Sequence, residues 1–194
     1  MTERWLYKGI SITYLKGHPS SYIHDFVHFP ANIIEDGIHQ KWAISDNYNT
    51  AELPDFIKPV NDSLETVAFM VIVNDSIQFE KYWHGYSSDT MSNSFSMSKS
   101  WVSTLTGVAI KEGKIKSVDQ KVCDFLPNFC EGRNAEVTIK NLLTMSSGLN
   151  WTEDYYNPIG QTSEAYYGNN LSGLISGLKV VDPPGKVFKY HSSC

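Results

Sequence analysis

The stretch 67–73, with sequence VAFMVIV, constrains the fold of this chain more than any other segment. Its consecutive apolar residues are typical of a β-strand that is covered on both faces. Residues 74–76 (NDS) follow, and they have the composition of a tight turn. Apolar and polar residues then alternate over 77–83, which predicts a second strand. The sequence therefore predicts a β-hairpin, followed by a loop over 85–93.

A helix is predicted directly after this loop. Residues 102–110 are mostly apolar and carry no charge, and Gly113 is placed to end the helix. We expect such a helix to lie inside the protein. Ser96 and Lys99 lie at its N-terminal end, within the sequence SFSMSKSW of residues 94–101.

Ser96 and Lys99 form a candidate reactive pair of the S-x-x-K type. Side chains three residues apart share one face of a helix, so the Lys99 amine can reach the Ser96 hydroxyl. A serine hydroxyl needs an adjacent base to become a good nucleophile. A lysine can be that base only where burial or a nearby cation lowers its pKa.

The alternative is that this S-x-x-K pattern has no chemical role, because it is short and occurs again at Ser176 and Lys179. Lys99 lies at the start of an apolar helix, where an unpaired ammonium would be costly to bury. Lys179 lies close to Pro183-Pro184 and is expected to be solvated. The context therefore favours Ser96 as the nucleophile.

Short helices and turns are predicted for the rest of the chain. Residues 117–120 (SVDQ) are similar to a capping box for a short helix that ends before Pro127. Thr138 is expected to cap a helix over 139–145.

The remaining segments are predicted to be mostly irregular. Residues 150–169 are expected to form a long tyrosine-rich loop, and 171–178 a further helix before a turn at 182–185. Residues 1–60 show little periodicity, which predicts an irregular N-terminal arm with one short helix or strand at most.

The composition argues against several classes of protein. At 194 residues, the chain is long enough for one sizeable core or two small subdomains. A net charge of -5 and the lack of Lys/Arg runs argue against nucleic-acid binding. No apolar run reaches membrane-spanning length. The start lacks a signal-peptide pattern, so we expect a cytoplasmic protein, or a periplasmic one whose leader was removed.

The cysteine and histidine patterns argue against two hydrolase classes. Cys123, Cys130 and Cys194 include no C-x-x-C pair, which argues against zinc. We interpret Cys123 and Cys130 as reduced core or loop residues. Neither H-E-x-x-H nor G-x-S-x-G occurs, which disfavours a zinc metalloprotease and an α/β-hydrolase.

Several segments, taken in order, resemble the serine β-lactamase-like hydrolases. This family includes class C β-lactamases, penicillin-binding D-alanyl-D-alanine carboxypeptidases, esterases and 6-aminohexanoate-dimer hydrolases. After the hairpin, the segments are SFSMSKS, KEGKIKSVDQKVCDFLP, TIKNLLTMSSGL and PPGKVFKYHS. The resemblance covers about Thr66 to Ser192, and LLTMSSGL is its most specific part. Residues 149–155 are most similar to the 6-aminohexanoate-dimer hydrolase branch.

The resemblance implies roles for individual residues. Ser96 matches the acylated nucleophile and Lys99 its basic partner. Tyr190, in Tyr190-His191-Ser192, matches the tyrosine that helps to move the proton, although a structural tyrosine is the alternative. Short Y-x-S and Y-x-N patterns recur elsewhere, at Tyr86, Tyr155 and Tyr167.

Three further residues are candidates for substrate binding. Ser192 matches the polar third position of the tyrosine motif. Tyr155 and Asp154 could face the substrate, and the alternative is that they belong to an exposed loop.

The sequence departs from the family pattern after Tyr190. The family's third motif, a Lys or His followed by Thr/Ser-Gly, is expected later in the chain, as are the strand that donates one oxyanion-hole N–H and the remaining sheet strands. The resemblance therefore implies an α+β chain that is the N-terminal part of a β-lactamase/transpeptidase-like fold, without the C-terminal strands. We expect an N-terminal arm (1–65), a β-hairpin with its lead-in loop (66–95), and a nucleophile helix with a helical subdomain (96–194).

The implied function is hydrolysis of an amide, ester or β-lactam bond through an acyl-enzyme, without a metal or an organic cofactor. The alternative is a non-catalytic penicillin-binding sensor or an inert scaffold. The expected partners are a small-molecule or peptide-like acyl substrate, and either a second copy or a second chain that supplies the missing strands.

Overall fold

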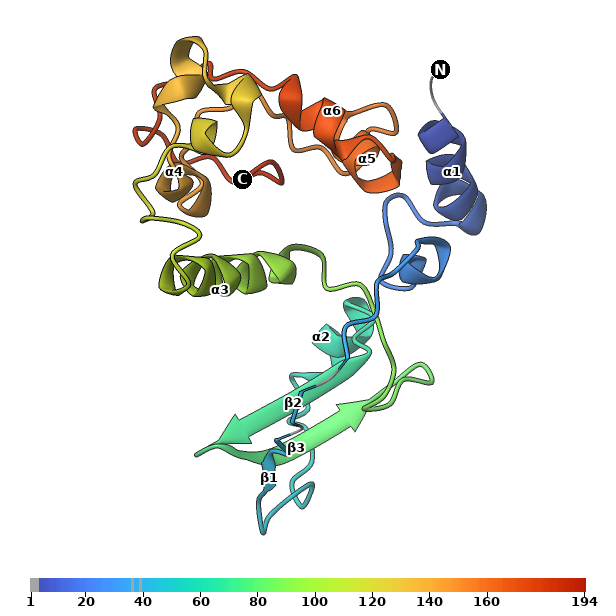
Figure 1. The fold of residues 1–194 in the computed structure, drawn as a ribbon. Coiled ribbons are helices and arrows are strands. Elements are labelled where there is room, and N and C mark those ends of the chain that lie inside the picture. Colours follow the sequence, from blue (N-terminus) through green and yellow to red (C-terminus); the bar gives the residue numbers. More distant parts are fainter. Residues whose placement is uncertain (1–3, 36, 39) are drawn as a thin grey trace. The chain divides into compact units, whose positions relative to one another are not determined.

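The computed structural model describes residues 4–35, 37–38 and 40–194, which form two compact units. The chain leaves the larger unit at Phe29, builds the smaller unit over 30–92, and returns to the larger unit at Asn93 (Figure 1). None of the described helices is both long enough and apolar enough to cross a bilayer.

The smaller unit contains a three-stranded sheet and one helix. Strands β1 (Ala43–Ile44), β2 (Ala68–Val73) and β3 (Ser76–Tyr82) lie in the order β1-β3-β2, and helix α2 spans Lys58–Ser63. β2 and β3 are antiparallel, which confirms the predicted hairpin. Both turn residues, Asn74 and Asp75, have positive φ, as a two-residue hairpin turn requires.

The expectation that residues 67–73 are covered on both faces is wrong for the described chain. β2 is the edge strand on its side of the sheet, and Met70, Ile72 and Val73 are 45%, 42% and 45% exposed. Among the described residues of this unit, Ile77 of β3 is the buried hydrophobic one. An apolar run indicates that a strand is suited to burial, but no other described segment packs over these residues.

The larger unit is helical. Its helices are α1 (Arg4–Ile12), α3 (Ser98–Lys111), α4 (Ile139–Leu143), α5 (Gln161–Tyr167) and α6 (Leu171–Ser176), joined by loops and short 3-10 turns. The core comprises Val122, Phe129, Val137, Leu149, Trp151, Leu178 and Val180. This core lies among the segments that follow α3 in the sequence.

Helix α3 confirms the predicted helix but not its burial. No residue of α3 is buried, and Trp101, Val102 and Leu105 are 71%, 59% and 60% exposed. The helix is apolar enough to be covered, yet no described element covers it. The expected inside position is therefore wrong for these residues.

Two further local predictions need correction. The expected irregular arm contains α1, β1 and α2. The expected loop over 150–169 contains α5, whose Tyr166 packs edge-on against Phe29 at 5.0 Å between ring centroids. This aromatic packing, which unites residues distant in sequence, is not visible in the local pattern.

One of the two predicted helix caps forms, and the other does not. Ser117 Oγ accepts a hydrogen bond from the Asp119 N–H two residues on, and only a 3-10 turn follows, so no capping box forms there. Thr138 does cap α4, in a capping box with Asn141. A cap needs the backbone to continue as a helix, which the residues after Gln120 do not do.

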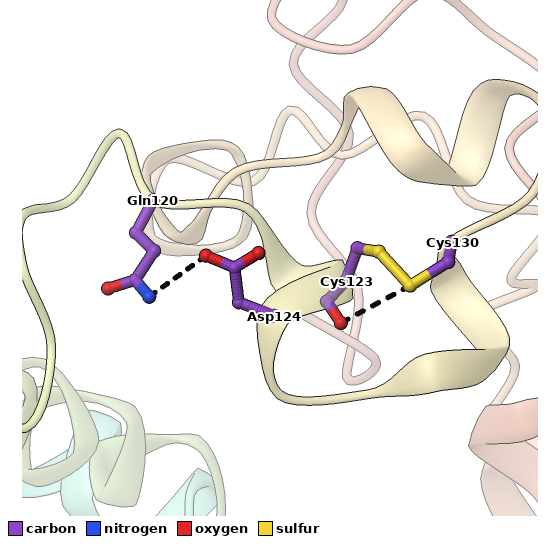
Figure 2. The surroundings of a disulfide bond; sticks show 4 residues. All are labelled: Gln120, Cys123, Asp124 and Cys130. Atoms are coloured by element: carbon purple, nitrogen blue, oxygen red, sulfur yellow. Dashed lines mark hydrogen bonds between the residues drawn. A yellow bond between two sulfur atoms is a disulfide. The ribbon is translucent and has the colours of Figure 1, made fainter.

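Cys123 and Cys130 form a disulfide, so their interpretation as reduced residues is wrong (Figure 2). Two 3-10 turns, Val122–Asp124 and Pro127–Phe129, fold the chain back between them and leave their Cα atoms 4.8 Å apart. This separation is within the range for a disulfide. Figure 2 also shows Gln120, whose amide donates to Asp124 on the same loop.

Candidate active site

Ser96 lies in the tight turn that leads into α3. The turn spans Phe95–Met97, and Ser96 is exposed. Phe95 has a φ of 44°, a left-handed conformation that costs a residue with a β-carbon about 1–2 kcal/mol. Strain of this kind often occurs at functional sites. The strained turn places Ser96 at the N-terminal end of α3, one turn before Lys99.

Lys99 is half-buried in the first turn of α3. Its Nζ donates to the main-chain oxygens of His191 at 3.4 Å and Cys194 at 3.3 Å. The same Nζ lies 5.8 Å from the centre of the Tyr190 ring. No Asp or Glu side chain among the described residues forms an ion pair with it. The structure therefore brings Lys99 and Tyr190 together, although they lie far apart in the sequence.

The segment that carries Tyr190 is held on both sides. Before it, the Lys189 N–H donates to the Met145 carbonyl at 2.8 Å, and Lys189 Nζ donates to the Trp151 carbonyl at 2.9 Å. After it, Ser192 is bound to Glu153 through its backbone and its side chain. Tyr190 itself is 44% exposed. Its ring is therefore accessible while its backbone is fixed.

Glu153 is the centre of the hydrogen bonds around this segment. One carboxylate oxygen accepts from the Trp151 indole at 2.7 Å and from the Ser192 N–H at 2.6 Å. The other accepts from Ser192 Oγ at 2.7 Å. Glu153 thus joins the 151–155 loop to the tyrosine motif.

Sequence reasoning missed Glu153. A usable signal exists, because Trp151, Glu153 and Tyr155 alternate along the chain and side chains two apart in an extended segment point to the same side. A carboxylate between two aromatic residues with polar tips has donors within reach on both sides.

The charges at this cluster follow from these contacts. Burial opposes ionisation of Glu153, but hydrogen bonds from Ser192, Tyr155 and Trp151 hold the pKa of its carboxyl below the ordinary value. The hydrogen bond to Glu153, with burial, raises the pKa of Tyr155 to about 12. At neutral pH, Glu153 is therefore ionised and Tyr155 is a neutral hydrogen-bond donor.

The residues next to Tyr190 pack beneath the surface. His191 is 1% exposed, and burial together with Lys189 lowers the pKa of its imidazole. Its Nδ1 lies 2.8 Å from Ser193 Oγ. Cys194 is a free cysteine, and its Sγ lies 3.0 Å from the Ser147 hydroxyl. These contacts support the main-chain oxygens that accept from Lys99.

The other candidate residues lie apart from these contacts. Asp154 Oδ1 accepts from the Tyr156 N–H at 3.0 Å, within its own loop. The second S-x-x-K pair, Ser176 and Lys179, is exposed, and the solvated Lys179 is confirmed.

A small sheet and a helical unit, in which Lys99 lies beside Tyr190, form an α+β fold of the β-lactamase type. The chain belongs to the Beta-lactamase family, whose model matches residues 53–193. This finding confirms the resemblance of its ordered motifs to that family.

Two relatives bear the same description. A 6-aminohexanoate-dimer hydrolase from Paenarthrobacter ureafaciens is 28% identical over 109 residues, which cover 56% of this chain and 27% of that relative. A solved structure from Bacillus anthracis, described as a candidate 6-aminohexanoate-dimer hydrolase, matches with a TM-score of 0.66 and 19% identity, over 79% of this chain and 45% of that one. The chain thus spans less than half of either relative, and its fold corresponds to the N-terminal part.

Proposed function

We propose that these residues provide the nucleophile, the base and the tyrosine of a serine hydrolase that works through an acyl-enzyme. The Ser96 hydroxyl oxygen attacks a substrate carbonyl carbon, and its proton passes to Lys99. The tetrahedral intermediate collapses as Lys99 and Tyr190 deliver a proton to the leaving group. Water then attacks the Ser96 ester, which releases the acid and restores the serine.

The environment of the Lys99 amine is the observation that carries this proposal. Lys99 Nζ lies 3.4 Å from the main-chain oxygen of His191 and 5.8 Å from the centre of the Tyr190 ring, in the first turn of the helix that follows Ser96. No Asp or Glu side chain in the described part of the chain forms an ion pair with it.

Full turnover is proposed to need residues beyond those described. The Ser96 N–H can supply one oxyanion donor, and the family places the second on a later strand. Removing one such donor typically costs about 10²–10³ in rate. A polypeptide that corresponds to the later half of the relatives would supply it. An amide, ester or β-lactam remains the proposed substrate.

Covalent labelling tests the nucleophile. We expect a fluorescent phosphonate or penicillin to label the chain at one site, and Ser96→Ala to abolish the label. Ser176→Ala is the matched control from the second S-x-x-K pair, and it should label normally. Equal labelling of both variants would overturn the assignment of Ser96. Stable labelling without turnover, even with the later half added, would instead favour a penicillin-binding sensor.

A further inference from the structure

Two accessible hydroxyl groups, those of Ser192 and Tyr155, interact with the half-buried carboxylate of Glu153. Ser192 is exposed and Tyr155 is 47% exposed. Ser192 Oγ donates to Glu153 at 2.7 Å, and hydrogen bonding with the same carboxylate is the main cause that raises the pKa of Tyr155. The Ser192 N–H donates to this carboxylate as well. One anion therefore orients the polar groups of both candidate substrate-binding residues.

This orientation decides what the two hydroxyl groups can offer to a ligand. Each hydroxyl has one proton and two acceptor lone pairs, and an ionised carboxylate only accepts. With both protons directed at Glu153, Ser192 and Tyr155 present acceptor lone pairs to the outside. A ligand group that meets them has to bring its own donor.

The nearby amines do not change this balance. Lys189 Nζ donates to the Trp151 carbonyl, and Lys99 Nζ donates to the main-chain oxygens of His191 and Cys194. His191 is buried and its pKa is lowered, so it is neutral at neutral pH. Turning either hydroxyl toward an anionic ligand would break a charge-assisted hydrogen bond, which is stronger than a neutral one.

We infer that Glu153 is a specificity-determining residue. By orienting Ser192 and Tyr155, it makes this edge of the site prefer ligands that carry a hydrogen-bond donor, such as an ammonium or an amide N–H, to carboxylates. The inference rests on the proposed function, because it takes this edge to face the acyl substrate. Its consequence for binding can be measured without catalysis.

The test follows ligand binding to the 194-residue chain by NMR, through the Trp151 indole N–H and the Ser192 amide N–H. Three probes of similar size are added separately: benzylammonium, benzyltrimethylammonium and phenylacetate. We expect saturable shifts with benzylammonium at concentrations at least about tenfold below those needed for phenylacetate. Benzyltrimethylammonium has the charge but no N–H donor, and we expect it to bind as weakly as phenylacetate.

Variants assign the preference to Glu153. Glu153→Gln, which can donate and so lets the hydroxyls turn outward, should reduce the preference for benzylammonium at least about fivefold. The exposed Glu131→Gln is the matched control and should keep it. If Glu153→Gln fails to fold, Ser192→Ala combined with Tyr155→Phe removes the acceptors instead and should abolish the preference.

The outcomes separate this inference from the proposed function. Ser96→Ala should keep the ligand preference while it loses covalent labelling. Equal shifts with the three probes, no shift with any of them, or a preference unchanged in Glu153→Gln would overturn the inference. Those results would leave the assignment of Ser96 intact, because that depends on labelling alone.

Discussion

The hydrogen bonds to Glu153 make the stability of the larger unit depend on pH. A carboxyl whose pKa is lower in the folded state stabilises the fold above its unfolded pKa, and this contribution is lost as the pH falls through the folded pKa. We therefore expect the free energy of unfolding to decrease as the pH falls below the ordinary carboxyl value of 4.5. Urea unfolding at a series of pH values measures it.

Glu153→Gln should flatten this acid-induced decrease, because the amide does not titrate in this range. At neutral pH the same change should lower the free energy of unfolding by about 2 kcal/mol, since it replaces hydrogen bonds to a charged acceptor. Glu131→Gln, an exposed position, should leave the pH profile as it is. A Glu153→Gln profile parallel to that of the unmodified chain would contradict the expected role of this carboxylate.

Lys99→Arg tests the base at the residue scale. A guanidinium stays protonated at any working pH, so it cannot accept the Ser96 proton. We expect the rate of covalent labelling to fall by about 10²–10⁴, the usual contribution of a general base, and not to recover at high pH. Lys179→Arg, in the exposed second pair, should label at the normal rate. An arginine variant that labels normally would rule out Lys99 as the base.

The residues of the candidate site were only partly predictable. The motif order pointed to Lys99 and Tyr190, and the structure brings these two together; their chemical roles and that of Ser96 stay predictions. The motif order does not include Glu153. The local alternation of Trp151, Glu153 and Tyr155 indicates a shared polar face, but the contact of Glu153 with Ser192, which is distant in sequence, cannot be read from it.

At the scale of elements, the disulfide bears on the compartment in which this chain folds. Disulfides persist in oxidising compartments and are rare in the cytosol. We therefore favour the periplasmic alternative over the cytoplasmic one. We expect alkylation of the unfolded, unreduced protein to modify Cys194 alone, and reduction first to expose Cys123 and Cys130 as well. Mass spectrometry distinguishes these products, and three alkylated cysteines without reductant would contradict the pairing.

The existence of elements was more predictable than their surroundings. The hairpin and α3 were correctly predicted because alternation and apolar runs are local properties. Their burial was not, because the pattern of β2 or α3 says nothing of whether another segment covers it. The disulfide was missed for a related reason, since two consecutive 3-10 turns, rather than cysteine spacing, bring Cys123 to Cys130.

At the scale of the whole molecule, the exposed apolar faces predict association. β2 has an open edge with exposed Met70 and Ile72, and α3 exposes Trp101 and Leu105. Open strand edges and apolar patches favour pairing with other chains. We expect light scattering to give a mass above that of one 21.9 kDa chain, and Ile72→Lys to lower it.

The control for this association is Ser88→Lys, which adds the same single positive charge at an exposed polar position of the same unit. Adding the later half as a separate polypeptide should replace the self-association and raise ester hydrolysis. A stable monomer with full turnover and no partner would show that neither a second copy nor a second chain is needed.

Asn93, where the chain returns to the larger unit, is held in place by hydrogen bonds. The Asn93 N–H donates to the Ile23 carbonyl at 2.9 Å, and its side chain donates to the Tyr166 hydroxyl at 2.7 Å, so the re-entry point is fastened close to the exit at Phe29. In the sequence, residues 30–92 are thus an insertion between the two segments of the larger unit. The entropic cost of closing such an insertion grows only with the logarithm of its length, by about 0.6 kcal/mol for each doubling. The larger unit can therefore tolerate a shorter, longer or different insertion at this point with little loss of stability.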